Sequence, residues 1–147
     1  MPNLCTSRSK LIMEIEIEVN GAIEDQEVIE LYRLHNWSSA EKPNQLLLAL
    51  RHSHTLVTAR IAGVLVGIAN AISDGYLVVY YPHLLVHPDF QRQGVGRKMV
   101  AAMQAIYGDY HQQMLTADGD AIAFYKSVGF VRAGNTQSLW VYSGTEH

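Results

Sequence analysis

The sequence LLVHPDFQRQGVGRK, residues 84–98, contains an apolar strand, a short loop and the start of a helix. Gly94 and Gly96 open the helix, and glycine lets a backbone approach a ligand closely because it has no Cβ. A helix start also presents N–H groups without helical partners and the positive end of the helix dipole, which suits phosphate. Positive charge at the same place comes from three basic side chains: Arg92, Arg97 and Lys98. Together these features predict a site for a ligand that carries a diphosphate.

The two glycines do not complete either of the common nucleotide-binding motifs. A P-loop requires Gly-x-x-x-x-Gly-Lys-Ser/Thr, and the sequence contains no such run. A dinucleotide fingerprint requires a third glycine where Met99 stands, within an early βαβ unit. On their own, two glycines at a helix start with solvated charges would favour a purely structural explanation.

Upstream of this stretch, the hydrophobic periodicity predicts four strands and two helices. Pro82 should interrupt the last of these strands, because proline is tolerated in sheets only at edges, strand starts or bulges. Asp25 is expected to cap the first helix. The expected elements are a strand at 13–19, a helix at 25–36, a helix from Pro43 that includes Leu46, Leu47 and Leu50, strands at 55–60 and 64–72 joined by a hairpin at Ala62-Gly63, and a strand at 76–87.

Downstream, a helix is expected at 95–107, ended by Gly108, and a second after Asp118 to Ser127, followed by Gly129. Short strands are expected at 113–116, 130–132 and 138–142. This order predicts one mixed α/β (α+β) domain, with strand–helix crossovers only in its second half. We expect a mobile N-terminal segment at 1–12 and the domain at 13–147.

The composition excludes several classes of protein. Of 147 residues, 48% are hydrophobic and 17% charged, which excludes an intrinsically disordered chain. A net charge of −3 argues against a broad basic face for nucleic acid. The single cysteine, Cys5, cannot form an internal disulfide. No apolar run approaches the roughly 20 residues that span a bilayer, and the polar start MPNLCTSRSK lacks a signal core, so we expect a cytoplasmic protein without membrane contact.

Two motifs identify a resemblance. Residues 91–96, QRQGVG, match the Gln/Arg-x-x-Gly-x-Gly/Ala signature of the GNAT superfamily of acetyl-CoA-dependent N-acetyltransferases, and the preceding Leu-x-Val-His-Pro-Asp strand end also resembles that family. About 28 residues after Gly96, residues 123–130, AFYKSVGF, resemble the family's second block, Phe-Tyr-x-x-x-Gly-Phe. The expected order of elements is also that of the family, so the resemblance covers nearly the whole chain.

The resemblance implies a GNAT-like fold with a central mixed sheet of about six to seven strands, splayed at the cofactor site and flanked by about four helices. The resemblance also implies acetyl-CoA as the co-substrate, and it implies no metal. The strand at Leu84, Leu85 and Val86 would pair through its backbone with the pantetheine amides. Asp118 stands where many members have Asn near the cofactor, although it is also placed to cap a helix. The other implied cofactor-binding residues are Gln91, Arg92, Gln93, Gly94, Val95, Gly96, Arg97, Lys98 and Tyr125.

The resemblance also implies direct transfer of an acetyl group to a primary amine, with Tyr125 as the general acid that protonates the CoA thiolate. The base is open. Many relatives place a glutamate in the strand before the signature loop or in the strand after it, but the comparable stretches here hold no carboxylate. His83 is the available titratable group, because the ordinary pKa of histidine is near neutral. A water chain, or an acceptor that arrives deprotonated, would serve instead.

Other interpretations remain open at this point. A GNAT-fold acyl-CoA sensor or interaction module without efficient catalysis would explain the absent carboxylate, and an unrelated phosphate-binding module would bind simple nucleotides. His52 and His54 lack a carboxylate or cysteine that would complete a metal site. Trp37 would either wall the acceptor site or pack in the core. The acceptor, a small-molecule or peptide amine, is not identified by the sequence, and a homodimer is possible.

Overall fold

The computed structural model describes residues 14–144, in which six strands form one mixed sheet flanked by four α-helices. The mixed α/β fold class is confirmed. The N-terminal segment expected at 1–12, with Cys5, lies outside the described residues. The strands are β1 (Ile15–Val19), β2 (Thr55–Ile61), β3 (Val64–Ser73), β4 (Val78–Tyr80), β5 (Leu84–Val86) and β6 (Gln112–Met114). The α-helices are α2 (Asp25–Leu34), α3 (Pro43–Arg51), α4 (Val95–Tyr107) and α5 (Asp120–Ser127), and two 3₁₀ helices are η1 (Ser38–Glu41) and η2 (Pro88–Phe90).

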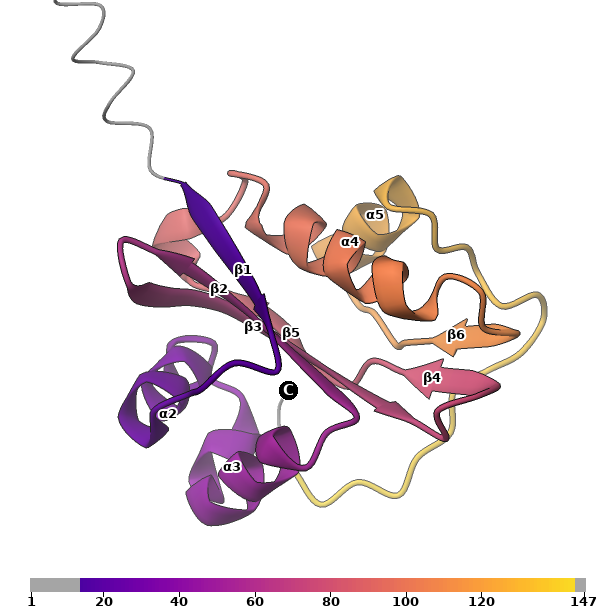
Figure 1. Cartoon of the computed structure of the whole chain (residues 1–147). Helices are drawn as coiled ribbons and strands as arrows, with labels where there is room; N and C mark the ends of the chain where they lie inside the picture. Colours follow the sequence, from indigo (N-terminus) through magenta and orange to yellow (C-terminus); the bar gives the residue numbers. More distant parts are fainter. Residues whose placement is uncertain (1–13, 145–147) are drawn as a thin grey trace, which may run out of the picture.

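The helices cover both faces of the sheet, with α2 and α3 on one side and α4 and α5 on the other (Figure 1). Side chains of β2 alternate between the two faces, as the period of a strand requires. Leu56 packs in the cluster with α2 and α3, whereas Val57 packs in the cluster with α4. Both side chains are buried, so β2 forms the centre of two separate cores. Between residues 14 and 144, no helix is both long and apolar enough to span a membrane.

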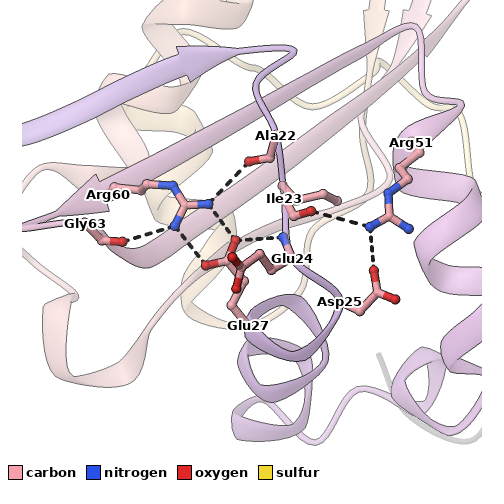
Figure 2. A network of polar contacts seen from close by, with 8 residues as sticks. All are labelled: Ala22, Ile23, Glu24, Asp25, Glu27, Arg51, Arg60 and Gly63. Atoms are coloured by element: carbon pink, nitrogen blue, oxygen red, sulfur yellow. Dashed lines mark hydrogen bonds and ion pairs between the residues drawn. The ribbon is translucent and has the colours of Figure 1, made fainter.

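Helix α2 is fixed to the sheet by polar contacts at its first turn (Figure 2). Glu24 caps the helix in a capping box with Glu27, so the expectation that Asp25 is the cap is wrong. Asp25 is instead the first helical residue and pairs with Arg51 of α3. Glu27 accepts two hydrogen bonds from the guanidinium of Arg60 on β2, at 2.6 and 2.8 Å. Arg60 holds the pKa of Glu27 below its usual value, mainly through this hydrogen bonding.

The strand expected at 76–87 is divided in two around Pro82, as the proline predicted. Strand β4 pairs with Ile72 and Ser73 of β3, whereas β5 pairs with residues 67–69 of the same strand. The buried side chain of Asn70 lies opposite the break and accepts a hydrogen bond from the backbone N–H of His83, at 3.1 Å. The side chain of Asn70 thus accepts the N–H of His83, while the backbone N–H of Asn70 still donates to the carbonyl of His83.

The two closing strands expected at 130–132 and 138–142 do not form. Residues 130–144 run without regular secondary structure, and Val131, Leu139 and Val141 are 85%, 89% and 107% exposed. Their segments are rich in the aromatic and β-branched residues typical of a strand, but in the described structure these three side chains pack against no sheet face. The segment returns to the η1 region, where the hydroxyl groups of Ser38 and Tyr142 lie 3.2 Å apart.

Candidate active site

The sheet opens where β4 and β5 separate. Strand β4 pairs in parallel with β6, and this pairing ends at the hydrogen bond from the N–H of Tyr81 to the carbonyl of Met114, at 3.0 Å. Strand β5 pairs with β3 alone among the described strands, so the sheet is splayed between β5 and the residues after β6. A mostly apolar pocket with about 280 Å³ of empty space, including its open mouth, lies there. Its lining consists of Ala69, Tyr81, His83, Leu84, Val100, Met103, Gln104, Leu115, Tyr125 and Phe130.

The register of β5 determines which backbone groups face this opening. Backbone hydrogen bonds join the N–H of Asn70 to the carbonyl of His83 and the N–H of His87 to the carbonyl of Val66. Hydrogen-bonded pairs occur at every second residue of an antiparallel ladder. Leu85 lies opposite Ile68 of β3, midway between these two pairs, so its N–H and carbonyl face β3. The expectation that the backbone of Leu85 binds the pantetheine arm is therefore corrected, since its polar groups face the neighbouring strand.

Leu84 and Val86 present their backbone groups at the open edge of β5. The carbonyl of Val86 already accepts hydrogen bonds from the ring Nε2 of His35, at 2.8 Å, and from the side-chain amide of Gln91, at 3.2 Å. Leu84 has no such side-chain partner within residues 14–144. The open edge thus offers Leu84 and the N–H of Val86 for pairing with an amide-bearing ligand.

A concave loop precedes α4 and presents backbone N–H groups. Gly94 adopts the left-handed conformation at φ 88°, and Arg92 does so at φ 63°, where a side chain is disfavoured. The carbonyl of Gly94 accepts the first helical hydrogen bond, from the N–H of Lys98. The N–H groups of residues 95–97 lie before it and have no intrahelical partner. This arrangement fits the diphosphate of a coenzyme.

The side chains of the same loop supply charge. Arg92 and Lys98 are exposed, as are Gln91 and Gln93. Arg97 is also exposed and donates a hydrogen bond to the hydroxyl group of Ser127 at the end of α5, at 3.2 Å. The expected anion-binding residues from 91 to 98 therefore lie on one continuous turn, and Arg97 joins that turn to α5.

Tyr125 projects from α5 into the lining of the pocket. Its ring contacts the rings of Phe124 and Phe130, with centroids 5.1 and 5.7 Å away. Burial raises the pKa of Tyr125 to about 12. The phenol therefore keeps its proton throughout the neutral range, as a general acid requires.

His83 lines the same pocket, and the aromatic side chains of Tyr32 and Trp37 pack against it. Its Nδ1 atom lies 2.7 Å from the hydroxyl oxygen of Tyr32, and its ring packs edge-on against Trp37, with centroids 5.1 Å apart. Trp37 in turn packs edge-on against Tyr32. Trp37 is half-buried and packs against the core cluster of α2 and α3, so the expectation that it packs in the core is confirmed, and its ring also lies beside His83. Tyr32 precedes His83 by 51 residues, and nothing in the local sequence predicts their contact.

Asp118 lies just before α5, with an exposed side chain. The helix is capped by Gly119 at φ 54°, so the expectation that Asp118 is its cap is wrong. The backbone carbonyl of Asp118 accepts a hydrogen bond from the N–H of Ala121, at 3.1 Å. Its expected contact with a cofactor stays a prediction.

Sequence inspection missed a polar network at the mouth of the opening. The hydroxyl of Tyr81 donates to the side-chain carbonyl of Gln113 on β6, at 2.7 Å. The amides of Gln113 and Gln104 exchange hydrogen bonds at 2.7 and 3.1 Å. This network joins the β4–β5 break, β6 and α4. Because its members are far apart in the sequence, no short motif reveals it.

Comparison with known proteins identifies this arrangement. The family described as "Acetyltransferase (GNAT) domain" matches residues 20–139, which is most of the chain and includes both the splayed strands and the glycine loop. The chain belongs to the GNAT acetyltransferase family. The resemblance of residues 91–96 and 123–130 is thereby confirmed at the level of the family.

Relatives of this GNAT chain include the N-alpha-acetyltransferase RimI of Mycobacterium tuberculosis strain H37Rv, 34% identical over 104 residues. The match covers 67% of this chain and 65% of RimI. The uncharacterized N-acetyltransferase ycf52 of Gracilaria tenuistipitata var. liui is 38% identical over 69 residues, which are 46% of this chain and 38% of that protein. The chain thus matches less than two thirds of the length of each of these two curated relatives.

Solved structures show the same GNAT fold. A GNAT family acetyltransferase from Streptococcus pneumoniae TIGR4 superposes with a TM-score of 0.77 at 25% identity, covering 88% of this chain and 98% of that one. The aminoglycoside N-acetyltransferase AAC(6')-Iy, solved in complex with CoA, has a TM-score of 0.67 at 16% identity. That match covers 89% of this chain and 95% of the other, and supports the fold alone.

Proposed function

We propose that this protein is an N-acetyltransferase that moves the acetyl group of acetyl-CoA directly to a primary amine. The observation that carries the proposal is that the open edge of β5, the N–H-lined turn before α4 and the phenol of Tyr125 adjoin one another. The first two provide for an extended amide chain and a diphosphate, and the third provides for proton transfer.

Binding is assigned to backbone groups. The N–H groups of residues 95–97 hold the diphosphate, with Arg92 and Lys98 adding charge beside it. Leu84 and the N–H of Val86 pair with the pantetheine amides, which extends β5 by one strand. The acetyl thioester then lies in the pocket lined by His83, Leu84 and Tyr125.

Tyr125 acts at the leaving group. The amine nitrogen bonds to the carbonyl carbon of the thioester, the carbon–sulfur bond breaks, and its electron pair goes to sulfur. The phenol O–H of Tyr125 gives its proton to that sulfur, so that CoA leaves as the thiol. The phenolate recovers a proton from solvent or from the acylated ammonium nitrogen, and no covalent enzyme intermediate is needed.

The acceptor is assigned only to the class of primary amines. RimI is named for N-alpha-acetylation, and AAC(6')-Iy for acetylation of aminoglycosides, so peptide N-termini and small polyamines are the first acceptors to test. No carboxylate lines the pocket among the described residues. We therefore assign deprotonation of the amine to a water chain, or to loss of the proton in solution before the amine binds. A cytoplasmic location and a homodimer stay predictions from the sequence.

The absent carboxylate also favours a second candidate, an acyl-CoA-binding module without efficient catalysis. Calorimetric titration with acetyl-CoA, with CoA, ATP and NAD as comparators, tests the co-substrate site without knowledge of the acceptor. We expect micromolar or tighter binding of acetyl-CoA and none of ATP or NAD. A screen of amine acceptors by release of CoA thiol then separates an enzyme from a binding module. Binding of ATP or NAD without acetyl-CoA would overturn both.

A further inference from the structure

Three of the side chains that line the pocket beside β5 are buried, and the others are half-buried. Ala69 of β3 is 3% exposed, and Val100 and Met103 of α4 are 6% and 3% exposed. Val100 and Met103 lie three residues apart on α4 and so share a face of the helix. These three side chains therefore form the inner wall of the pocket, whereas the half-buried ones, including Tyr125, lie nearer its mouth.

The inner wall is apolar, because its only side-chain atom that is not carbon is the thioether sulfur of Met103. Two polar side chains of the lining, Tyr81 and Gln104, are hydrogen-bonded to Gln113. A polar group pushed against the inner wall would lose its hydrogen bonds to water without replacing them. The buried end of the pocket therefore suits a hydrocarbon group.

The inner wall also has little room to move. Ala69 and Met103 belong to the core cluster between the sheet and α4, together with the buried side chains of Val79 and Tyr107. Protein cores are close-packed, and extra methylene groups forced into them push side chains out of their preferred rotamers. Met103 has the longest side chain of the wall. Its position therefore limits how far a hydrocarbon chain can extend toward α4.

We propose that Met103 sets the length of the acyl chain that this protein transfers: the inner wall accepts the methyl group of an acetyl thioester and rejects a chain as long as butyryl. The inference rests on the proposed function, since it uses the thioester in the same pocket. Tyr125 acts on the sulfur, nearer the mouth. The acyl chain begins one bond from that sulfur and runs inward, toward the side chains of Val100 and Met103.

Binding measurements isolate the acyl group without any acceptor amine. CoA, acetyl-CoA, propionyl-CoA and butyryl-CoA share the same diphosphate and pantetheine, so the differences among their Kd values come from the acyl end. For the wild type, we expect calorimetry to show that butyryl-CoA binds about tenfold or more weakly than acetyl-CoA. Propionyl-CoA should lie between them.

Met103→Ala removes three heavy atoms from the inner wall and should reverse this order. Each buried methylene group contributes about fourfold in affinity, so butyryl-CoA should bind about tenfold more tightly than acetyl-CoA. Met99→Ala is the matched control, because Met99 is a completely buried methionine one turn earlier on α4 that does not line the pocket. Its Cε atom packs against β3, where a Cβ at Gly67 would lie 2.9 Å away. This variant should keep the wild-type order.

Val100→Leu tests the same wall without emptying the core, so it decides the question if Met103→Ala does not fold. The added carbon takes up space in the pocket. Acetyl-CoA should therefore bind about tenfold more weakly to this variant, while the Kd of CoA stays unchanged. An unchanged order of chain lengths in a folded Met103→Ala, the same reversal in Met99→Ala, or equal weakening of CoA and acetyl-CoA in Val100→Leu would overturn the inference and leave the proposed function standing. If the wild type bound neither CoA nor any acyl-CoA, both would be overturned.

Discussion

Gly96, in the first turn of α4, lies against the ring of Phe124 on α5: a Cβ at Gly96 would come within 3.1 Å of the ring carbon Cζ. The next nearest atoms are another carbon of the same ring, at 3.5 Å, and Cγ2 of Val86, at 3.7 Å. This glycine therefore brings the N–H-lined turn, α5 and the end of β5 together. Tyr125 follows Phe124 in α5, so the position of Tyr125 depends on the same packing.

Gly96→Ala should weaken acetyl-CoA binding about tenfold, which corresponds to about 1.4 kcal/mol. The added methyl group pushes Phe124 away and moves α5 relative to the loop. Calorimetry measures the change in Kd, with Ala101→Ser on the exposed side of α4 as the control. Alanine has the better helix propensity, so if only local propensity mattered, the variant would be more stable and bind equally well.

Tyr125→Phe should lower kcat about 100-fold or more and leave the Kd of acetyl-CoA unchanged, because only the acidic proton is lost. Burial raises the pKa of Tyr125 to about 12, so the wild-type phenol stays protonated as the pH rises to about 11. The pH–rate profile of kcat should therefore show no loss of rate from this residue below pH 11. An alkaline limb near pH 10 that disappears in the variant would contradict the raised pKa of Tyr125.

Arg60→Ala should lower the free energy of unfolding by about 1–2 kcal/mol at pH 7, since it leaves the carboxylate of Glu27 without its charged donor. The pKa of Glu27 is depressed in the folded protein from its ordinary value of 4.5. Its contribution to stability is therefore present above about pH 4.5 and is lost as the pH falls through the lower, folded value. Urea unfolding of the wild type and of Glu27→Gln measures this loss: the two free energies of unfolding should differ at pH 7 and become closer at pH 3.

The exposed pair between Asp25 and Arg51 provides the comparison for that prediction. Both side chains are substantially exposed, and solvent-exposed pairs contribute about 0–1 kcal/mol. Asp25→Asn should therefore change the free energy of unfolding less than Arg60→Ala does. Equal effects would show that burial of the Glu27–Arg60 pair adds nothing.

Asn70→Ala should destabilise the protein by about 1–3 kcal/mol, because the side chain is buried and pairs at both ends. Its Oδ1 atom accepts from the N–H of His83, and its Nδ2 atom donates to the hydroxyl of Ser53, at 3.0 Å. Loss of the first bond frees the segment between β4 and β5, so acetyl-CoA binding should weaken as well. The exposed Asn135→Ala is the control for thermal unfolding and calorimetry.

The elements that were predicted correctly depend on local signals. Helix α4 begins and ends where Gly94 and Gly108 predicted, and Pro82 predicted the break between β4 and β5. The closing strands expected at 130–132 and 138–142 did not form. Apolar residues such as Leu139 and Val141 form a strand only when a sheet provides a partner and a buried face, which they lack in the described structure.

In the candidate site, too, the features with local signals were predicted and those that depend on long-range packing were not. The turn at residues 91–98 and Tyr125 were found because their motifs are short and continuous. The partner of His83 was not found, because Tyr32 reaches it through the packing of α2 on the sheet. The register that turns Leu85 toward β3 was also invisible, since it depends on which residue of β3 stands opposite. Long-range pairing, not residue type, decides these features.

Strand β3 pairs with β5 at residues 67–69 and with β4 at Ile72 and Ser73, the two strands that separate at the opening. The separation of the strands is therefore fixed by covalent continuity and by Asn70, and not by whatever enters between them. A ligand entering such a preformed site has no sheet rearrangement to wait for. In stopped-flow experiments, the observed association rate should rise in proportion to acetyl-CoA concentration without reaching a plateau.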